Sequence, residues 1–244
     1  MANEQIAPQK IITFEKIDTQ IYESVDEVSN AVAKEIAALI RIKKAEGKLA
    51  VLGLATGVTP KNVYSALIKL HKEEGLSFEN VVSFNLDEYF SLQPDAMQSY
   101  YRFMNENLFK HIDIKKEHCF IPPGIVTEEE AKAACEKYEQ QIESFGGIDF
   151  QLLGIGRNGH IGFNEPGSHV SSITRMITLD HLTRFDAAYE FGGIANVPRK
   201  AITMGIGTIL KARRIVLMAW GERKANIIKE AVEGPVTEFV PASY

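Results

Sequence analysis

Residues 154–167 read GIGRNGHIGFNEPG and bring Asn158, His160 and Glu165 together on a glycine-rich backbone. An imidazole changes protonation near neutral pH, and a neighbouring carboxylate or amide orients its ring. A single loop histidine is usually an ordinary surface residue. A histidine between an asparagine and a glutamate, directly after an apolar run, instead indicates general acid–base chemistry.

The same stretch contains a G-x-G-x-x-G spacing over residues 154–159, which is typical of dinucleotide-binding loops. That use requires a helix to begin at the glycines, so that the pyrophosphate meets the helix N-terminus. Gly162, Pro166 and Gly167 would break such a helix within two turns. We therefore expect no nucleotide site here, and we expect the glycines to bring the backbone close to a ligand.

A second pair of candidate groups, Asp87 and Glu88, lies in SFNLDEYF at the end of an apolar run. A carboxylate that is partly desolvated at a strand end has a raised pKa, which suits a general base. The alternative is that Asp87 caps a following turn while Glu88 is solvated. The residues alone leave both readings open.

Two segments are suited to binding an anion. Residues 52–60, LGLATGVTP, run from a predicted strand into a helix that Pro60 begins, where free N–H groups and the helix dipole favour a phosphate. A lysine in the first turn of residues 222–233 opposes the helix dipole, and a bound phosphate would remove that conflict. An ordinary turn and a solvated lysine are the alternatives. The candidate ligands are Thr56, Gly57, Val58, Thr59 and Lys224.

Short apolar runs alternate with longer amphipathic stretches along the chain. The pattern predicts an α/β fold, an open, mostly parallel, doubly wound and Rossmann-like sheet with helices on both faces. Ligands bind such sheets at the carboxyl ends of the strands, where the irregular stretches 86–99 and 155–178 begin. The predicted strands are 49–54, 81–86, 149–155, 201–204 and 214–220, and the predicted helices are 26–45, 60–74, 128–145 and 222–233.

The bulk composition limits the classes of partner. A formal net charge of -5 over 244 residues argues against a general binder of nucleic acid or anionic membrane. Cys119 and Cys135 lack metal-ligand spacing, and a disulfide framework is not expected. Residues 1–10 lack the apolar core of a signal peptide, and no segment approaches a membrane span of ~20 apolar residues. We expect a soluble, cytoplasmic protein.

Several motifs, taken in order, resemble those of the glucosamine-6-phosphate deaminase family. The resemblance runs from about residue 20 to the end of the chain. It implies an α/β sheet fold and the conversion of glucosamine 6-phosphate and water to fructose 6-phosphate and ammonia, in amino-sugar catabolism, without a metal or redox cofactor. The motifs are LGLATGVTP, VVSFNLDEY, QSYYRFMNENLF, GIGRNGHIGFNEPGS, Val197-Pro198 with AITMGIGTIL, and GERKA.

The resemblance also implies roles for the candidate residues. Asp87 matches the base that moves a proton between C1 and C2 during enolisation. His160 matches the residue that opens the pyranose ring, helped by Asn158 and Glu165. The turn 56–59 and Lys224 match phosphate contacts. Val58, Asn158 and Tyr189 stand where other members carry Gly or Ser, Asp, and a phosphate-binding Arg, respectively.

Other functions remain open at this stage. One is a related enzyme, either a galactosamine-6-phosphate deaminase or a 6-phosphogluconolactonase, although a lactonase does not need Asp87 as an enolisation base. Another is a non-catalytic sugar-phosphate sensor. We expect one domain over residues 1–244, without the last C-terminal strand and helix of the family. The expected partner is a small sugar phosphate, neither nucleic acid nor membrane, and the sequence leaves open whether the chain forms a homo-oligomer.

Overall fold

The computed structural model describes residues 15–244, so the N-terminal decapeptide considered above lies outside the described part. Five strands form one sheet in the order β4-β2-β1-β5-β8, and every neighbouring pair is parallel. This confirms the predicted α/β class with its mostly parallel sheet. The strands are β1 (Ala50–Leu54), β2 (Val81–Asn85), β4 (Cys119–Phe120), β5 (Phe150–Leu153) and β8 (Arg214–Leu217).

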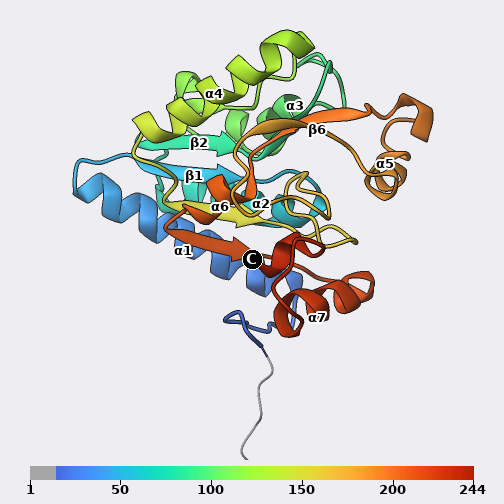
Figure 1. Ribbon diagram of the computed structural model, residues 1–244. Helices are drawn as coiled ribbons and strands as arrows, with labels where there is room; N and C mark the ends of the chain where they lie inside the picture. Colours follow the sequence, from blue (N-terminus) through green and yellow to red (C-terminus); the bar gives the residue numbers. More distant parts are fainter. Residues whose placement is uncertain (1–14) are drawn as a thin grey trace, which may run out of the picture.

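Helices cover both faces of the sheet, with α4 on one side and α1 on the other (Figure 1). Leu52 and Leu54 of β1 belong to a core that they share with α1 and α2, whereas Val51 of the same strand belongs to a second core, shared with α4, α6 and α7. Successive strand residues point to opposite faces, which explains why these strands are apolar throughout. The helices are α1 (Val25–Ala45), α2 (Val58–Glu74), α3 (Tyr100–Asn107), α4 (Glu128–Ser144), α5 (His181–Ala187), α6 (Ile206–Leu210) and α7 (Ala225–Glu233).

The predicted helices are found with small shifts, and side-chain caps set the starts of α1 and α4. In α1, the side chain of Ser24 accepts a hydrogen bond from the Glu27 amide, which sets the first turn. Thr127 and Glu130 form a reciprocal capping box at α4. The predicted helix 222–233 is divided into a 3₁₀ turn, Glu222–Lys224, and α7.

A second, three-stranded sheet was not predicted. Its order is β3-β7-β6 and both pairs are antiparallel. The predicted strand 201–204 lies in this sheet and not in the parallel one, because an apolar run does not specify its pairing partner. The expectation that 86–99 and 155–178 are irregular is wrong at β3 and β6. The strands are β3 (Asp87–Tyr89), β6 (Arg175–Thr178) and β7 (Lys200–Thr203).

Cys119 in β4 and Cys135 in α4 are both free thiols. Over residues 15–244, no helix combines the length and the apolar character that crossing a bilayer requires.

Candidate active site

A hydrogen-bonded chain connects Glu165, Asn158 and His160. The Asn158 amide nitrogen donates to Oε2 of Glu165 at 2.9 Å, and the Asn158 amide oxygen lies 2.7 Å from Nδ1 of His160. Burial alone would raise the pKa of Glu165, but its contacts with His160, Thr183 and Asn158 hold that pKa below its ordinary value. Glu165 is therefore an ionised carboxylate that acts on the imidazole both directly, at 3.4 Å, and through Asn158.

This chain determines which imidazole nitrogen carries the proton. The Asn158 nitrogen faces a carboxylate and must donate, so its oxygen faces His160 and can only accept. Nδ1 of His160 is then the protonated nitrogen, and Nε2 has a free lone pair. His160 can therefore accept a proton at Nε2.

Gly156 makes room for the His160 ring. A Cβ atom at Gly156 would lie 2.2 Å from the nearest ring carbon of His160. The Gly156 amide also donates to the His160 carbonyl oxygen at 2.9 Å, which closes the loop on itself. The missing side chain at Gly156 thus makes room for the protein's own imidazole, and the expected close approach of these glycines to a ligand stays a prediction. The expected lack of a helix at residues 154–159 is confirmed.

Asp87 lies in β3, and its carboxyl group is buried. Burial, followed by the negative charge of Glu88, raises the pKa of Asp87 to about 8. Glu88 is itself buried. The alternative of a turn-capping Asp87 beside a solvated Glu88 is thus wrong, because both residues belong to β3 and both are buried.

The His160 loop and Asp87 share one frame. A Cβ atom at Gly162 would lie 3.2 Å from Oδ2 of Asp87, so the loop backbone passes directly over the carboxyl group. The Phe163 amide donates to Oγ1 of Thr203 at 3.0 Å, and Thr203 pairs with Asp87 across the sheet. The structure therefore brings together the two groups that the sequence could only propose separately.

The predicted phosphate-binding residues lie against the end of β5. Gly57 is the N-cap of α2 with a φ of 94°, and the helix begins at Val58 and not at Pro60. A Cβ atom at Gly154 would lie 3.6 Å from Cβ of Thr59, and Nζ of Lys224 donates to the Ile155 carbonyl at 2.6 Å. The turn and Lys224 thus both lie beside residues 154–155, so the reading of Lys224 as a fully solvated lysine is wrong.

Val58 has an ordinary backbone conformation, and Tyr189 is exposed. Among residues 15–244, Ser91 is the one non-glycine residue with positive φ, so Val58 is not strained in the turn. The side chain of Tyr189 is 95% exposed and points to solvent. It makes no contribution to the site in this conformation.

Residues in α5 and at its N-cap, whose contacts sequence reasoning missed, also reach this loop. Oγ1 of Thr183 lies 3.4 Å from Nδ1 of His160, and the Asp180 amide at the N-cap donates to Oε1 of Glu165 at 3.3 Å. Arg157 pairs with Asp186. No sequence signal marks these contacts, since they depend on how α5, the helix standing apart from the sheet at the right of Figure 1, folds back on the loop.

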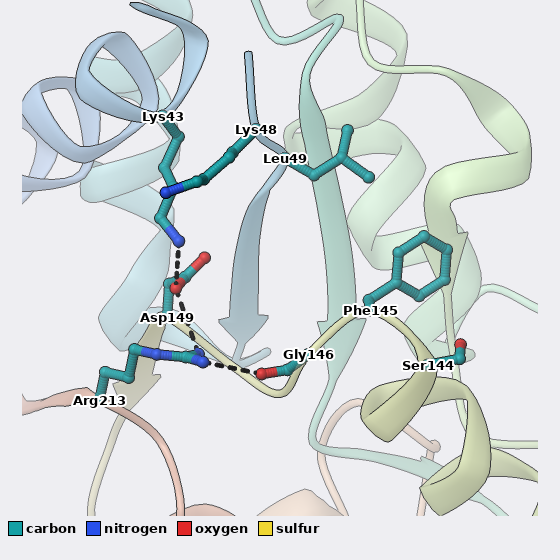
Figure 2. A pocket seen from close by; sticks show the side chains of 8 residues that line it. All are labelled: Lys43, Lys48, Leu49, Ser144, Phe145, Gly146, Asp149 and Arg213. Atoms are coloured by element: carbon teal, nitrogen blue, oxygen red, sulfur yellow. Dashed lines mark hydrogen bonds and ion pairs between the residues drawn. The ribbon is translucent and has the colours of Figure 1, made fainter. Parts of the chain in front are cut away.

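A separate cavity of about 300 Å³ lies near the amino ends of β1 and β5, away from the predicted residues (Figure 2). It is lined by Asp149, a buried carboxylate that contacts Nζ of Lys43 at 2.7 Å and the Arg213 guanidinium at 3.2 Å. These cations neutralise a structural carboxylate. The lining residues are Lys43, Lys48, Leu49, Ser144, Phe145, Gly146, Asp149 and Arg213. In the described part of the chain, no group of three or more His, Cys, Asp or Glu is placed to hold a metal ion.

Comparison with known proteins connects this geometry with named relatives. A family model described as glucosamine-6-phosphate isomerases/6-phosphogluconolactonase matches residues 23–244. The chain is 53% identical over 230 residues to a putative glucosamine-6-phosphate deaminase-like protein of Bacteroides thetaiotaomicron, covering 94% of this chain but only 35% of that protein. It is 47% identical over 227 residues to glucosamine-6-phosphate deaminase 1 of Bacillus subtilis, covering 93% of this chain and 90% of the relative.

Solved structures show the same relationship. A monomeric glucosamine-6-phosphate deaminase superimposes with a TM-score of 0.88 at 45% identity, over 93% of this chain and 92% of that one. The 6-phosphogluconolactonase of Trypanosoma brucei superimposes with a TM-score of 0.72 at 21% identity, over 93% of both chains, which shows a shared fold alone.

Proposed function

Because the chain belongs to the glucosamine-6-phosphate isomerase/6-phosphogluconolactonase family, we propose that it converts glucosamine 6-phosphate and water to fructose 6-phosphate and ammonia. One observation carries the proposal. A buried carboxyl group of raised pKa, Asp87, lies beneath the same loop that holds the Glu165–Asn158–His160 chain. The reaction needs two separate proton transfers, and this arrangement supplies one group for each.

Ring opening falls to His160. Its free Nε2 accepts the proton of the C1 hydroxyl, and the imidazolium returns a proton to the ring oxygen as the C1–O bond breaks. The Glu165 carboxylate stabilises the transient positive charge directly and through Asn158. The product of this step is the open-chain amino aldehyde.

Enolisation falls to Asp87. Its carboxylate removes the proton from C2 and delivers it to C1, while the C1 oxygen gains a proton and the amino nitrogen loses one, which converts the amino aldehyde to an imine at C2. Water adds to that imine and ammonia leaves, giving the ketose. An acid with a pKa of about 8 exchanges protons readily near neutral pH, as a group that must both take and return a proton requires.

The phosphate provides the anchor. The free N–H groups at the start of α2, within the turn 56–59, and the half-buried Lys224 ammonium hold it at a distance from the reacting carbons. Binding energy at this remote group aligns C2 with Asp87. Burial lowers the pKa of Lys224, and a bound phosphate would favour its charged form again.

A lactonase or a non-catalytic sensor is less well supported. Hydrolysis of a lactone requires no base at C2, and a pure binder has no use for a buried carboxyl group with a raised pKa. We also propose that the enzyme is a soluble cytoplasmic protein of one domain that acts on a small sugar phosphate.

The test is release of ammonia and fructose 6-phosphate from glucosamine 6-phosphate by the wild type and by Asp87→Asn. We expect turnover by the wild type and a loss of about 10²-fold or more in the variant. Galactosamine 6-phosphate and 6-phosphogluconolactone are assayed separately as alternative substrates. Absence of turnover by the wild type contradicts the proposed function, and undiminished turnover by the variant removes Asp87 as the base.

A further inference from the structure

Glu88, next to Asp87, is a buried carboxylate that the proposed mechanism does not use. Glu88 is 3% exposed, and its carboxylate accepts three backbone hydrogen bonds. Oε1 accepts from the amides of Tyr89 at 2.9 Å and Tyr100 at 3.0 Å, and Oε2 accepts from the amide of Tyr101 at 3.0 Å. Three charge-assisted hydrogen bonds to one carboxylate hold its side chain in a fixed position.

Two of these donors are the first amides of α3. The first N–H groups of a helix have no partner within the helix and need an acceptor from outside it. Ser99, the N-cap, satisfies only the Arg102 amide with its side chain, at 3.0 Å. Glu88 supplies the acceptor for Tyr100 and Tyr101, so the carboxylate of β3 caps α3 from another part of the chain.

The position of α3 is transmitted to the His160 loop through aromatic packing. The Tyr100 ring lies 5.0 Å from the Tyr89 ring and 5.9 Å from the Phe163 ring, with which it stacks at 15°. Phe163 belongs to the loop between His160 and Glu165. A displacement of α3 would therefore move the loop relative to β3.

We propose that Glu88 is a positioning residue of this active site, which holds the base Asp87 and the His160 loop in register by capping α3. The inference rests on the proposed function, since it concerns the same site. Glu88 does not touch the reacting atoms in this role. It acts through Tyr100 and Phe163 on one side and through its own strand on the other.

The negative charge of Glu88 has a second effect, on Asp87. Four tyrosines are also coupled electrostatically to Asp87, but burial raises the pKa of each phenol, and they are uncharged at neutral pH. Burial also raises the pKa of Glu88, while its three N–H donors favour the ionised form. Ionised Glu88 makes the loss of a proton from Asp87 harder. The four tyrosines coupled to Asp87 are Tyr64, Tyr89, Tyr100 and Tyr138.

Three variants separate position from charge. Glu88→Gln removes the charge and places an amide donor against backbone N–H groups. Glu88→Asp keeps the charge but is too short to reach Tyr100 and Tyr101. Ser99→Ala removes the other side-chain cap of α3 and leaves the charge beside Asp87 unchanged. Circular dichroism and thermal unfolding establish that each variant is folded.

The measurements are kcat and KM across pH, together with a ¹³C NMR titration of the Asp87 carboxyl group. For Glu88→Gln we expect a kcat lower by about 10-fold to 100-fold with KM little changed. We also expect an Asp87 titration that moves about one pH unit lower. Glu88→Asp should lose kcat and keep the wild-type titration. Ser99→Ala should keep the wild-type titration and most of the activity.

The outcomes are distinguishable from failure of the proposed function. A wild type without deaminase activity contradicts the function, and the Asp87 titration still tests the coupling to Glu88. With an active wild type, an unchanged kcat in Glu88→Asp overturns the positioning role, also when Glu88→Gln does not fold. An Asp87 titration in Glu88→Gln identical to that of the wild type overturns the electrostatic part.

Discussion

The amide oxygen of Asn158 lies 2.7 Å from Nδ1 of His160, and this contact joins an uncharged side chain to the residue that we propose opens the ring. An aspartate at position 158 would orient the imidazole and also supply a charge. Here Asn158 orients the ring while Glu165, 2.9 Å from the Asn158 amide nitrogen, supplies the charge. Orientation of the imidazole and the negative charge beside it thus come from two different side chains.

Replacing Asn158 should impair ring opening. We expect Asn158→Ala to lower kcat by about 10²-fold, because His160 loses the acceptor that keeps its proton on Nδ1. Asn158→Asp keeps an acceptor and should retain activity within about 10-fold, with a changed pH profile caused by repulsion between two carboxylates. Steady-state assays of ammonia release measure both. Equal losses in the two variants would show that the acceptor at Nδ1 is not what matters.

The pH profile should reflect the raised pKa of Asp87. The free enzyme needs an ionised base, and the pKa of Asp87 is raised to about 8, first by burial and then by Glu88. We therefore expect kcat/KM to increase with pH up to a region near 8. A profile that is flat from pH 5 to 8 would contradict this assignment, and Asp87→Asn serves as the control for a residual pH dependence from other groups.

The same carboxyl group should reduce stability at high pH. Its pKa in the folded state, about 8, lies above the ordinary value of 3.8. The folded protein then binds this proton more tightly than the unfolded chain, so the contribution of Asp87 to stability is full below pH 4 and is lost as the pH increases through 8.

Asp87→Asn removes this titration and should raise the free energy of unfolding at pH 9 by on the order of 2 kcal/mol or more. The gain should become small near pH 4. Thermal unfolding of both proteins across pH measures the difference, which corresponds to about 5 °C in Tm for a chain of this size. A gain that does not change with pH would indicate a packing effect and not a charge effect.

Gly156 should tolerate no side chain. In Gly156→Ala the new methyl group would lie 2.2 Å from the His160 ring, so the ring must move. A shift of about 1 Å in a catalytic group costs on the order of 10² in rate, and we expect kcat to fall accordingly. Gly154→Ala is the matched control, since its methyl group would lie 3.6 Å from Thr59 in ordinary contact. Comparable kcat values in the two variants would refute the packing argument.

Lys224 should matter for binding more than for chemistry. Its ammonium donates to the Ile155 carbonyl, beside the turn 56–59. We expect Lys224→Met to raise KM for the sugar phosphate by about 10-fold or more and to weaken inhibition by inorganic phosphate, with a smaller change in kcat. Lys229→Met in α7, the helix that follows Lys224, is the control. A fall in kcat without a change in KM would place Lys224 in the chemical step.

Much of the fold and part of the site could be predicted because their signals are local. Apolar runs and helical spacing located β1, β2, β5, α1 and α4 to within a few residues. The glycine and proline residues after Gly159 excluded a helix, and that expectation is confirmed. The candidate groups could be predicted because Asp87 comes shortly after the apolar β2, and residues 158, 160 and 165 lie in the loop that follows the apolar β5.

Tertiary structure alone decided how those groups act. The antiparallel sheet that places Asp87 opposite Thr203 depends on pairing between distant segments, which periodicity does not encode. The sequence is compatible with a solvated Glu88, but in the structure Glu88 is buried and accepts hydrogen bonds from two amides of α3. Thr183 approaches His160 only because α5 folds back. The sequence by itself thus determined which residues are available for proton transfer, while long-range packing set their burial, their partners and therefore the pKa of Asp87.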